Sequence, residues 1–313
     1  MYVSGDVGEI IVGCGGWQYF IIPNMDPLEA YSMAFRFVEV NSTFYKIPPM
    51  DLVRSWRRRV PRDFEFSVRL NRLVSHIEKL NPTEKAVKAF QDCVEVAETL
   101  RSKILVLETP RSLDSIKAVN GLENILKKVD LGDIRIAWEP RAGWPPKAVE
   151  EAIKLKLIPI TDYSIEEPPY DDEEIAYTRL FGKGNHNIYQ FTDDDLIRIK
   201  ERAEKRRSKK IYLSFHGIRM YLDAARLERF LKKGELPRVT KSYGIDSLAE
   251  VLVDASFPAT KEELVRKHGW KLIDIDEKTR VPASVILKQL RRKNYRSLDE
   301  LLRELRMRFE KTG

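Results

Sequence analysis

Short apolar runs alternate with amphipathic stretches over the first two-thirds of the chain, and this alternation limits the folds it can adopt. Eight of the runs have the length and composition of β-strands, and the amphipathic stretches between them have helical character. Eight β units with intervening helices predict a closed parallel barrel. The strand candidates are 10–14, 37–40, 65–68, 104–107, 134–138, 158–161, 176–180 and 211–215. The helix candidates are 27–34, 51–59, 83–100, 113–128, 147–154, 192–207 and 220–232.

An open, doubly wound parallel sheet would produce the same alternation. It is the second choice, because no GxGxxG turn opens a helix anywhere in the chain. We therefore expect an α/β fold in which residues 1–236 form a TIM-like (β/α) barrel.

The pattern changes near Gly234-Glu235-Leu236-Pro237, which indicates a second domain over residues 237–313. Four helix candidates and one short strand candidate follow, and Thr260 with Glu263 forms a T-x-x-E capping box. We expect a small, basic and mostly α-helical domain. Its helix candidates are 247–252, 260–267, 282–291 and 297–309, its strand candidate is 270–273, and its basic residues include Lys288, Arg291, Arg292, Lys293 and Arg296.

The composition limits the cellular compartment in which we expect the protein and the kinds of partner it can have. No apolar run reaches the roughly 18 residues of a membrane span, and Met1–Glu9 carries acids and lacks the order of a signal peptide. Cys14 and Cys93 are the only two cysteines, too few for a disulfide framework. We expect a soluble, cytoplasmic protein with no membrane and no disulfide partner. With 33% charged residues and only 4 glutamines, the composition also resembles that of a thermophile.

The segment Val38–Tyr45 predicts a functional site. Period-2 alternation places Val38 and Val40 on one face of the strand and Glu39 and Asn41 on the other. An acid that faces inward beside an amide at a strand end indicates a site, because burying an unpaired carboxylate is costly. Glu39 could act as a general base, as a carboxylate paired to an arginine, or as part of an ion pair that stiffens the barrel mouth.

The C-terminal ends of barrel strands surround one site, so polar residues at the other strand ends are further candidates. Glu139 and Arg141 could bind an anion or form a structural ion pair that closes the barrel top. His216 follows a strand, where a histidine can transfer protons or bind an anion. The other candidates are Trp17, Tyr19, Tyr45, Arg69, His76, Trp144 and Arg179.

Some of these residues have plainer interpretations. The aromatic residues could stack on a base or a sugar, or they could simply cap the barrel core. His76 lies in a predicted loop, where a histidine is more often a hydrogen-bonding scaffold, and His186 is expected to be exposed in another loop.

A metal site is not favoured. The possible ligands, which are Glu39, Glu139, Asp162 and His216, are interrupted by arginines, and no HxxxH, HxD or DxD motif marks a strand end. The cofactor is left open, with a divalent ion as the alternative.

Several segments carry a family resemblance. They are Gly13-Cys14-Gly15-Gly16-Trp17-Gln18-Tyr19, Val38-Glu39-Val40-Asn41-Ser42-Thr43-Phe44-Tyr45, Pro61-Arg62-Asp63-Phe64-Glu65-Phe66 and Glu139-Pro140-Arg141, with Trp144. Residues 8–232 resemble the YecE-like family, domain of unknown function 72. The resemblance implies a TIM-like barrel with its pocket at the strand ends, and DNA binding has been suggested for the family by analogy with endonuclease IV.

The sequence departs from the family at two strand ends, and the C-terminal part of the chain resembles a different group of domains. Arg179-Leu180-Phe181-Gly182 stands where arginine, an apolar residue, histidine and glycine are usual, and Ser214-Phe215-His216-Gly217 stands where phenylalanine-asparagine-asparagine is usual. The role of histidine at this mouth is therefore not carried over. Residues 257–305 are similar to small helical domains appended to archaeal proteins.

Our leading hypothesis from the sequence is a phosphate-directed barrel protein that binds or hydrolyses DNA or RNA. A net charge of +7 and a pI near 9.2 favour polyanionic partners, and basic runs lie on or near predicted helices. In a nuclease-like phosphodiester hydrolase, Arg141 and Arg179 would hold the phosphate, Glu39 or Glu139 would activate water, and His216 would assist the leaving group. The alternatives are an isomerase or hydrolase acting on a sugar or sugar phosphate, and a non-catalytic nucleic-acid-binding module.

Overall fold

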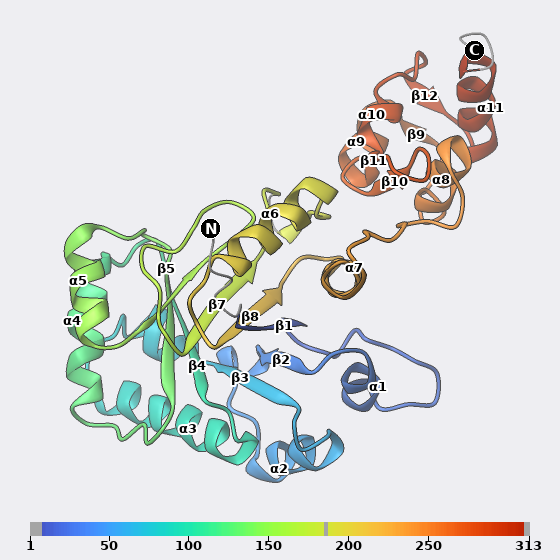
Figure 1. Ribbon diagram of the computed structural model, residues 1–313. Helices are drawn as coiled ribbons and strands as arrows, with labels where there is room; N and C mark the ends of the chain where they lie inside the picture. Colours follow the sequence, from blue (N-terminus) through green and yellow to red (C-terminus); the bar gives the residue numbers. More distant parts are fainter. Residues whose placement is uncertain (1–7, 185–186, 310–313) are drawn as a thin grey trace, which may run out of the picture. The chain divides into compact units, whose positions relative to one another are not determined.

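The computed structural model describes residues 8–184 and 187–309 (Figure 1). The expectations for the first residues of the chain and for His186 fall outside this part. The chain forms two compact units: the first comprises residues 1–181, 198–216 and 220–225, and the second comprises residues 182–197, 217–219 and 226–313.

The first unit contains a closed barrel of parallel strands in the order β1 to β8, with β8 paired back onto β1. The predicted TIM-like fold is confirmed. The strands are β1 (Glu9–Cys14), β2 (Phe37–Val40), β3 (Glu65–Arg69), β4 (Ile104–Thr109), β5 (Arg135–Pro140), β6 (Ile158–Thr161), β7 (Ile175–Leu180) and β8 (Lys210–Phe215).

Helices follow most of the strands, and local signals in the sequence explain where they begin. The side chains of Asp26, Thr83 and Asp114 accept hydrogen bonds from the first turns of α1, α3 and α4. Residues 162–174, between β6 and β7, form no helix. The helices are α1 (Pro27–Ala34), α2 (Met50–Arg59), α3 (Glu84–Leu100), α4 (Ser115–Leu126), α5 (Pro146–Lys154), α6 (Asp193–Glu204) and α7 (Met220–Lys233), with short helical turns η1 (Ser42–Phe44) and η2 (Leu73–Ile77).

The barrel interior is built in layers, because every second side chain of a strand points inward. Its middle is apolar and includes Phe37, Val106, Ala137 and Tyr177, all of them buried. Two residues further along the same strands stand Glu39, Glu108, Glu139 and Arg179. The interior therefore changes from apolar to charged at the C-terminal mouth.

The second unit has its own apolar core, which includes Leu248, Ile273, Leu287 and Leu301. The capping box at Thr260 is confirmed, since its side chain accepts from the backbone of Glu263 while that glutamate accepts from the backbone of Thr260. The helices are α8 (Gly244–Val251), α9 (Lys261–His268), α10 (Ser284–Leu287) and α11 (Leu298–Phe309).

Two details of the second unit differ from the sequence prediction. The helix expected over 282–291 is reduced to the single turn α10. Instead of one strand there are two small antiparallel sheets, β10 (Leu272–Asp274) with β11 (Arg280–Pro282), and β9 (Ala259–Thr260) with β12 (Asn294–Tyr295). Strands of two or three residues are too short to show a period-2 pattern.

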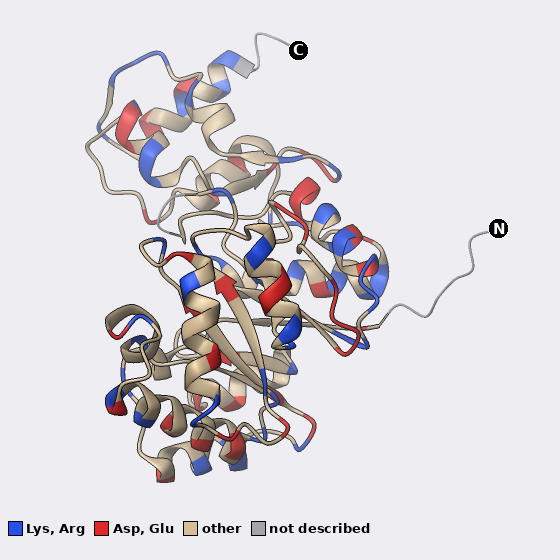
Figure 2. Ribbon diagram, turned by 90° about the vertical axis from the view of Figure 1, so that its left-hand side faces the viewer, with Lys and Arg blue, Asp and Glu red and all other residues tan. Residues whose placement is uncertain are grey.

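In the described part of the chain, no helix is both long enough and apolar enough to cross a membrane. Cys14 and Cys93 are both free and buried. Figure 2 shows basic and acidic residues interspersed along most helices, whereas α2 ends in the three arginines Arg57, Arg58 and Arg59.

Candidate functional site

Arg179, at the end of β7, is the centre of the charged layer at the barrel mouth. Its guanidinium lies 3.1 Å from Glu39 Oε1, 2.6 Å from Glu108 Oε2 and 2.5 Å from Glu139 Oε2. Only 1% of its side chain is exposed. Such a buried arginine needs several anionic partners to offset its desolvation, and three carboxylates supply them.

Strand register explains why these acids converge. Glu108 of β4 and Glu139 of β5 are paired residues of adjacent strands, so their side chains leave the sheet side by side. Both accept a hydrogen bond from the same nitrogen of Arg179. The arginine thereby holds together two carboxylates that would otherwise repel each other.

Two further arginines complete a balanced network of three arginines and three glutamates. Arg69 donates to Glu108 at 2.8 Å, and Arg141 lies 3.2 Å from Glu139 and 3.6 Å from Glu108. With 35% of its side chain exposed, Arg141 is the most accessible of these six side chains. It is therefore the arginine that an incoming anion would meet first.

His216 joins the network through Glu39. Its Nε2 lies 3.3 Å from Glu39 Oε2 and 3.0 Å from Ser214 Oγ, and its Nδ1 lies 3.5 Å from the amide nitrogen of Asn41. Burial, together with the positive charges of Arg179 and Arg69, lowers the pKa of His216, although Glu39 acts in the opposite direction. The imidazole is therefore neutral near pH 7.

The contacts of His216 also assign its tautomer. An ionised Glu39 can only accept, so Nε2 carries the hydrogen and Nδ1 keeps its lone pair. Nδ1 then faces the donor amide of Asn41, which also donates to the carbonyl of Gly15 at 2.9 Å. A side chain at position 15 would collide with this arrangement, because a Cβ there would lie 2.2 Å from Nδ1 of His216.

Environment separates the pKa values of the three glutamates. Burial would raise the pKa of Glu39, but Arg179 and His216 outweigh burial and lower it. The pKa of Glu108 is lowered to about 2, because Arg179, Arg69 and Arg141 together outweigh burial. For Glu139, burial and the neighbouring Glu108 outweigh Arg179 and Arg141, so its pKa is raised. Glu139 thus binds a proton more readily than the other two.

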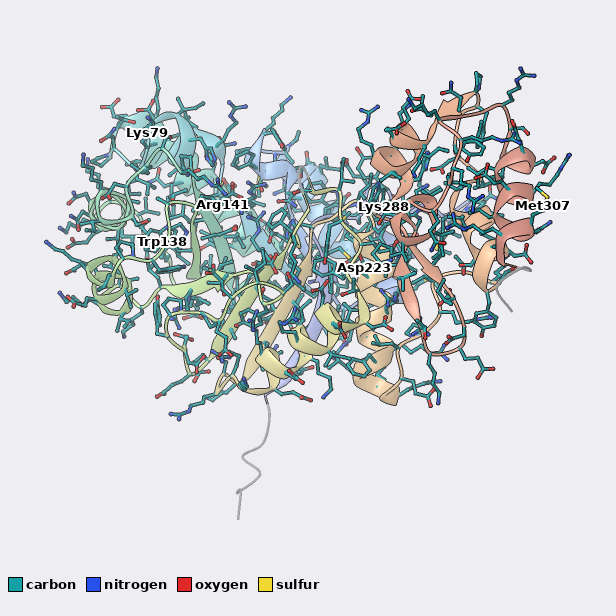
Figure 3. The ribbon with its side chains drawn as sticks, turned by 90° about the horizontal axis from the view of Figure 1, so that it is seen from above. Lys79, Trp138, Arg141, Asp223, Lys288 and Met307 are labelled. Carbon is teal, nitrogen blue, oxygen red and sulfur yellow. The ribbon has the colours of Figure 1, made fainter. Side chains whose placement is uncertain are left out.

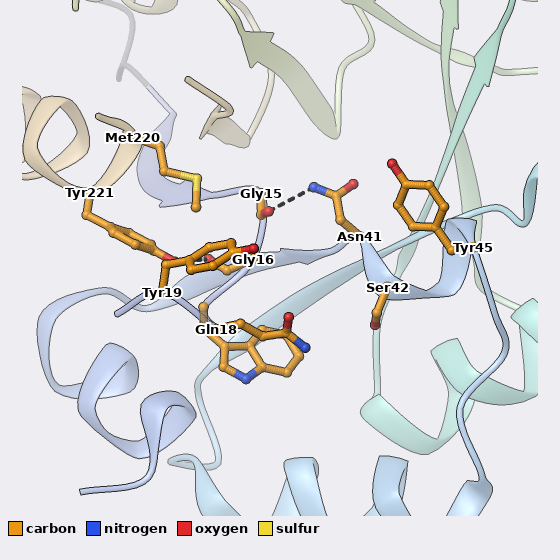
Figure 4. Close-up of a pocket in the computed structure, with 10 residues that line it drawn as sticks. Gly15, Gly16, Gln18, Tyr19, Asn41, Ser42, Tyr45, Met220 and Tyr221 are labelled. Carbon is orange, nitrogen blue, oxygen red and sulfur yellow. Dashed lines mark hydrogen bonds between the residues drawn. The ribbon is translucent and has the colours of Figure 1, made fainter. Parts of the chain in front are cut away.

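A cavity of about 350 Å³ opens beside this network. Asn41 and Gly15 belong both to its wall and to the surroundings of His216. Figure 4 shows Tyr19 and Tyr221 on one side of the cavity and Tyr45 on the other. The cavity therefore combines aromatic walls with polar groups that lead to the charged layer. Its lining residues are Gly15, Gly16, Trp17, Gln18, Tyr19, Asn41, Ser42, Tyr45, Met220 and Tyr221.

The structure brings most of the predicted polar residues together. Glu39, Glu139, Arg69, Arg141 and Arg179 are in the network. His216 and Asn41 lie against it, and His76 reaches its edge, 3.9 Å from Glu108. His76 belongs to the helical turn η2, so the prediction of a loop there is wrong.

The predicted aromatic residues divide into two groups. Trp17, Tyr19 and Tyr45 line the cavity, and 81% of Tyr19 is exposed. Trp144 instead packs edge-on against Trp138 of β5, with ring centres 5.0 Å apart (Figure 3 labels Trp138 and Arg141). A substrate contact by Trp144 stays a prediction.

Sequence reasoning missed Glu108, Tyr177 and Ser67. The hydroxyl group of Tyr177 donates to Glu39 at 2.9 Å and lies 2.7 Å from Ser67 Oγ. Tyr177 therefore holds the Glu39 carboxylate directly, and Ser67 does so through Tyr177. Glu108 was missed because the strand was expected to end at Leu107. An acid two positions beyond the inward-facing Val106 was the available signal.

Within residues 8–184 and 187–309, no group of three or more His, Cys, Asp or Glu side chains is arranged to hold a metal ion. Each carboxylate of the network is bound by at least one arginine. The donor set therefore resembles an ion-pair network rather than a metal centre.

Comparison with known proteins identifies the family. The family described as "Protein of unknown function DUF72" matches residues 11–243. Among solved structures, a DUF72 family protein from Thermotoga maritima MSB8 is 20% identical, with a TM-score of 0.60 over 72% of this chain and 100% of that one. Another, from Enterococcus faecalis V583, is 16% identical, with a TM-score of 0.58 over 72% of this chain and 98% of that one. No curated protein matches the chain. The chain therefore belongs to the DUF72 family of barrel proteins.

Proposed function

We propose that the barrel mouth is the active site of an enzyme that moves protons on a small sugar or sugar phosphate. The observation that supports this most is the separation of pKa values between two buried glutamates bound by one arginine. Glu39 is held ionised, whereas the pKa of Glu139 is raised. Pairs of groups driven apart in this way are typical of acid and base assignments in active sites.

The geometry assigns a role to each group. Glu39 is completely buried, so it acts as a positioning residue that orients His216. His216 is the base, because its Nδ1 keeps a lone pair, directed towards the amide of Asn41, and because Asn41 and Gly15 belong to the cavity wall. Glu139 is the acid, because its raised pKa makes it take up a proton more readily than Glu39 or Glu108.

The cavity favours a small polar substrate. Its volume is near the lower end of the roughly 300–1,000 Å³ range of ligand pockets. Aromatic faces pack against the apolar face of a sugar ring, while Gln18, Asn41 and Ser42 offer partners for its hydroxyl groups. Arg141 would bind a phosphate substituent. Arg179 has three carboxylate partners and little exposure, so we assign it a positioning role rather than phosphate contact.

Proton exchange tests this proposal directly. The protein is incubated in D2O with a panel of aldoses, ketoses and their phosphates, and deuterium uptake next to the carbonyl carbon is followed by NMR. We expect uptake in at least one substrate, and Glu139→Gln should slow it by about a hundredfold or more. Glu98→Gln, which changes an exposed glutamate of α3, is the matched control and should exchange at the wild-type rate. Absence of exchange across the panel, or equal rates in both variants, would contradict the proposal.

The distribution of charge favours a second candidate, a nucleic-acid-binding protein. Residues 237–313, which we propose as a separate basic domain, contain 17 Lys and Arg against 12 Asp and Glu. They account for +5 of the net charge of +7. Neutralisation of backbone phosphates by such residues is the main source of nucleic-acid affinity. In this candidate, the nuclease-like reaction would use the same mouth residues, with Arg141 on the phosphate.

A further inference from the structure

A second cavity, of about 360 Å³, lies at the opposite, N-terminal end of the barrel. Its wall is formed where β1, β3, β4 and β8 begin, with contributions from α2 and from Arg101, which directly follows α3. The acids in the wall are Glu9, Asp63 and Glu65. The cations are Arg36, Arg57, Arg62, Arg101, Lys103 and Lys210. The cavity therefore carries an excess of positive charge.

Three of the six cations have acidic partners. Arg36 lies 2.9 Å from Glu9, Lys210 lies 2.7 Å from Glu65, and Lys103 lies 3.1 Å from the exposed Asp133. These pairs account for two of the three acids in the wall. Of the wall acids, only Asp63 is then left to face the other three cations.

The remaining three cations are arginines without a hydrogen-bonded or ion-paired acid among the described residues. Arg57 donates only to backbone carbonyls, including that of Phe64 at 2.7 Å, and its guanidinium lies 5.3 Å from the centre of the Phe66 ring. Neither Arg62 nor the Arg101 side chain makes a hydrogen bond or ion pair in the described part of the chain. With Asp63 counted against them, these three arginines leave an excess of two positive charges.

Like charges held this close repel each other. Burial lowers the pKa of Arg57, and the positive charge of Arg101 lowers it further. The repulsion would be relieved by a ligand that brings about two negative charges, and a phosphate group carries about 1.5 to 2 at neutral pH. Arg57 is held in place by four backbone carbonyls that accept from both terminal nitrogens of its guanidinium, so it contributes a fixed positive charge to the cavity.

We propose that this cavity is a binding site for the phosphate group of a small molecule, separate from the barrel mouth. Arg62 and Arg101 bind the phosphate oxygens, Arg57 adds its positive charge beside them, and the remaining space accepts the organic part of a phosphate monoester. The concave shape favours a small ligand over a nucleic-acid backbone, which is tracked by an extended groove.

Calorimetric titration of the full chain tests the site. The probes are inorganic phosphate and glycerol phosphate, each at an ionic strength matched with chloride, and the two arms separate free phosphate from an ester. We expect saturable binding of at least one probe, weakened about tenfold or more in the double variant Arg62→Gln with Arg101→Gln. Both side chains are exposed, so the variant should fold.

Two control variants test whether the measured binding belongs to this cavity. Arg58→Gln with Arg229→Gln removes the same charge from exposed positions outside the cavity and should bind as the wild type does. Arg141→Gln removes the accessible cation of the barrel mouth, so the phosphate binding that persists in this variant belongs to the second cavity. Loss of binding in Arg141→Gln alone would assign the phosphate to the mouth and overturn the proposal. So would an absence of saturable binding, or equal binding of the probes by the wild type and by the double variant Arg62→Gln with Arg101→Gln.

Discussion

At the scale of single residues, the neutral His216 makes the barrel mouth sensitive to pH. Burial keeps its imidazole uncharged in the folded protein, whereas in the unfolded chain it titrates at its ordinary pKa near 6.5. As pH falls through 6.5, the unfolded state therefore takes up a proton that the folded state does not. His216 therefore contributes a decrease in the free energy of unfolding as pH falls in this range.

We expect His216→Asn to reduce that decrease. Asparagine cannot be protonated, so the variant should lose less stability than the wild type between pH 7.5 and 5.5. Urea unfolding at the two pH values measures the difference. His268→Asn is the comparison, because burial also lowers the pKa of that histidine but it lies in the second unit. If His216→Asn kept the full wild-type pH dependence, His216 would not be the neutral residue described here.

At the scale of helices and strands, the repeating pattern was enough to predict the barrel. All eight expected strands are present, and those at 37–40 and 158–161 have the predicted bounds. Long elements are predictable because burial imposes a period on many residues at once. The small sheets of the second unit contain too few residues to show one.

The candidate site was predictable in position but not in composition. Strand ends pointed to Glu39, Glu139 and Arg141, because charged residues directly after apolar runs are visible in the sequence. The partners of Arg179 were not visible, since they depend on the register between strands that are distant in the chain. Glu108 shows this most clearly, because its meaning comes from its pairing with Glu139.

The capping box of α9 gives a prediction at this scale. Thr260→Ala should destabilise α9 by about 1 kcal/mol, because the amide of Glu263 loses its acceptor. Hydrogen exchange of the α9 amides should therefore be about fivefold faster in the variant. Thr260→Ser keeps a hydroxyl at this position and should restore the wild-type rate. Equal protection in the alanine variant would mean that tertiary packing alone holds the helix.

At the scale of the whole molecule, charge is distributed unevenly along the chain. The network at the barrel mouth is balanced, whereas residues 237–313 carry most of the net positive charge. A polyanion that binds through this excess should contact the tail rather than the mouth. The two proposed functions, a sugar-converting enzyme and a nucleic-acid-binding protein, therefore place the essential residues in different parts of the chain.

A salt series separates these two candidates. If the tail binds nucleic acid, single- or double-stranded DNA or RNA should bind with an affinity that falls steeply with salt. The triple variant Lys288→Gln, Arg291→Gln, Lys293→Gln should reduce the slope of log affinity against log salt by about two to three. A matched triple variant of exposed barrel lysines, Lys85→Gln, Lys117→Gln, Lys147→Gln, should keep the wild-type slope. Absent binding, or equal slopes in the two variants, would remove nucleic acid as a partner of the tail.

The contact between Gly15 and His216 links two positions that are 201 residues apart in the chain. The imidazole occupies the volume that any side chain at position 15 would need. A relative with alanine or a larger residue at position 15 must therefore have a smaller residue at position 216, or a displaced β8 end. The residues at positions 15 and 216 should therefore covary among relatives, so the pair can identify which members of the family share this barrel mouth.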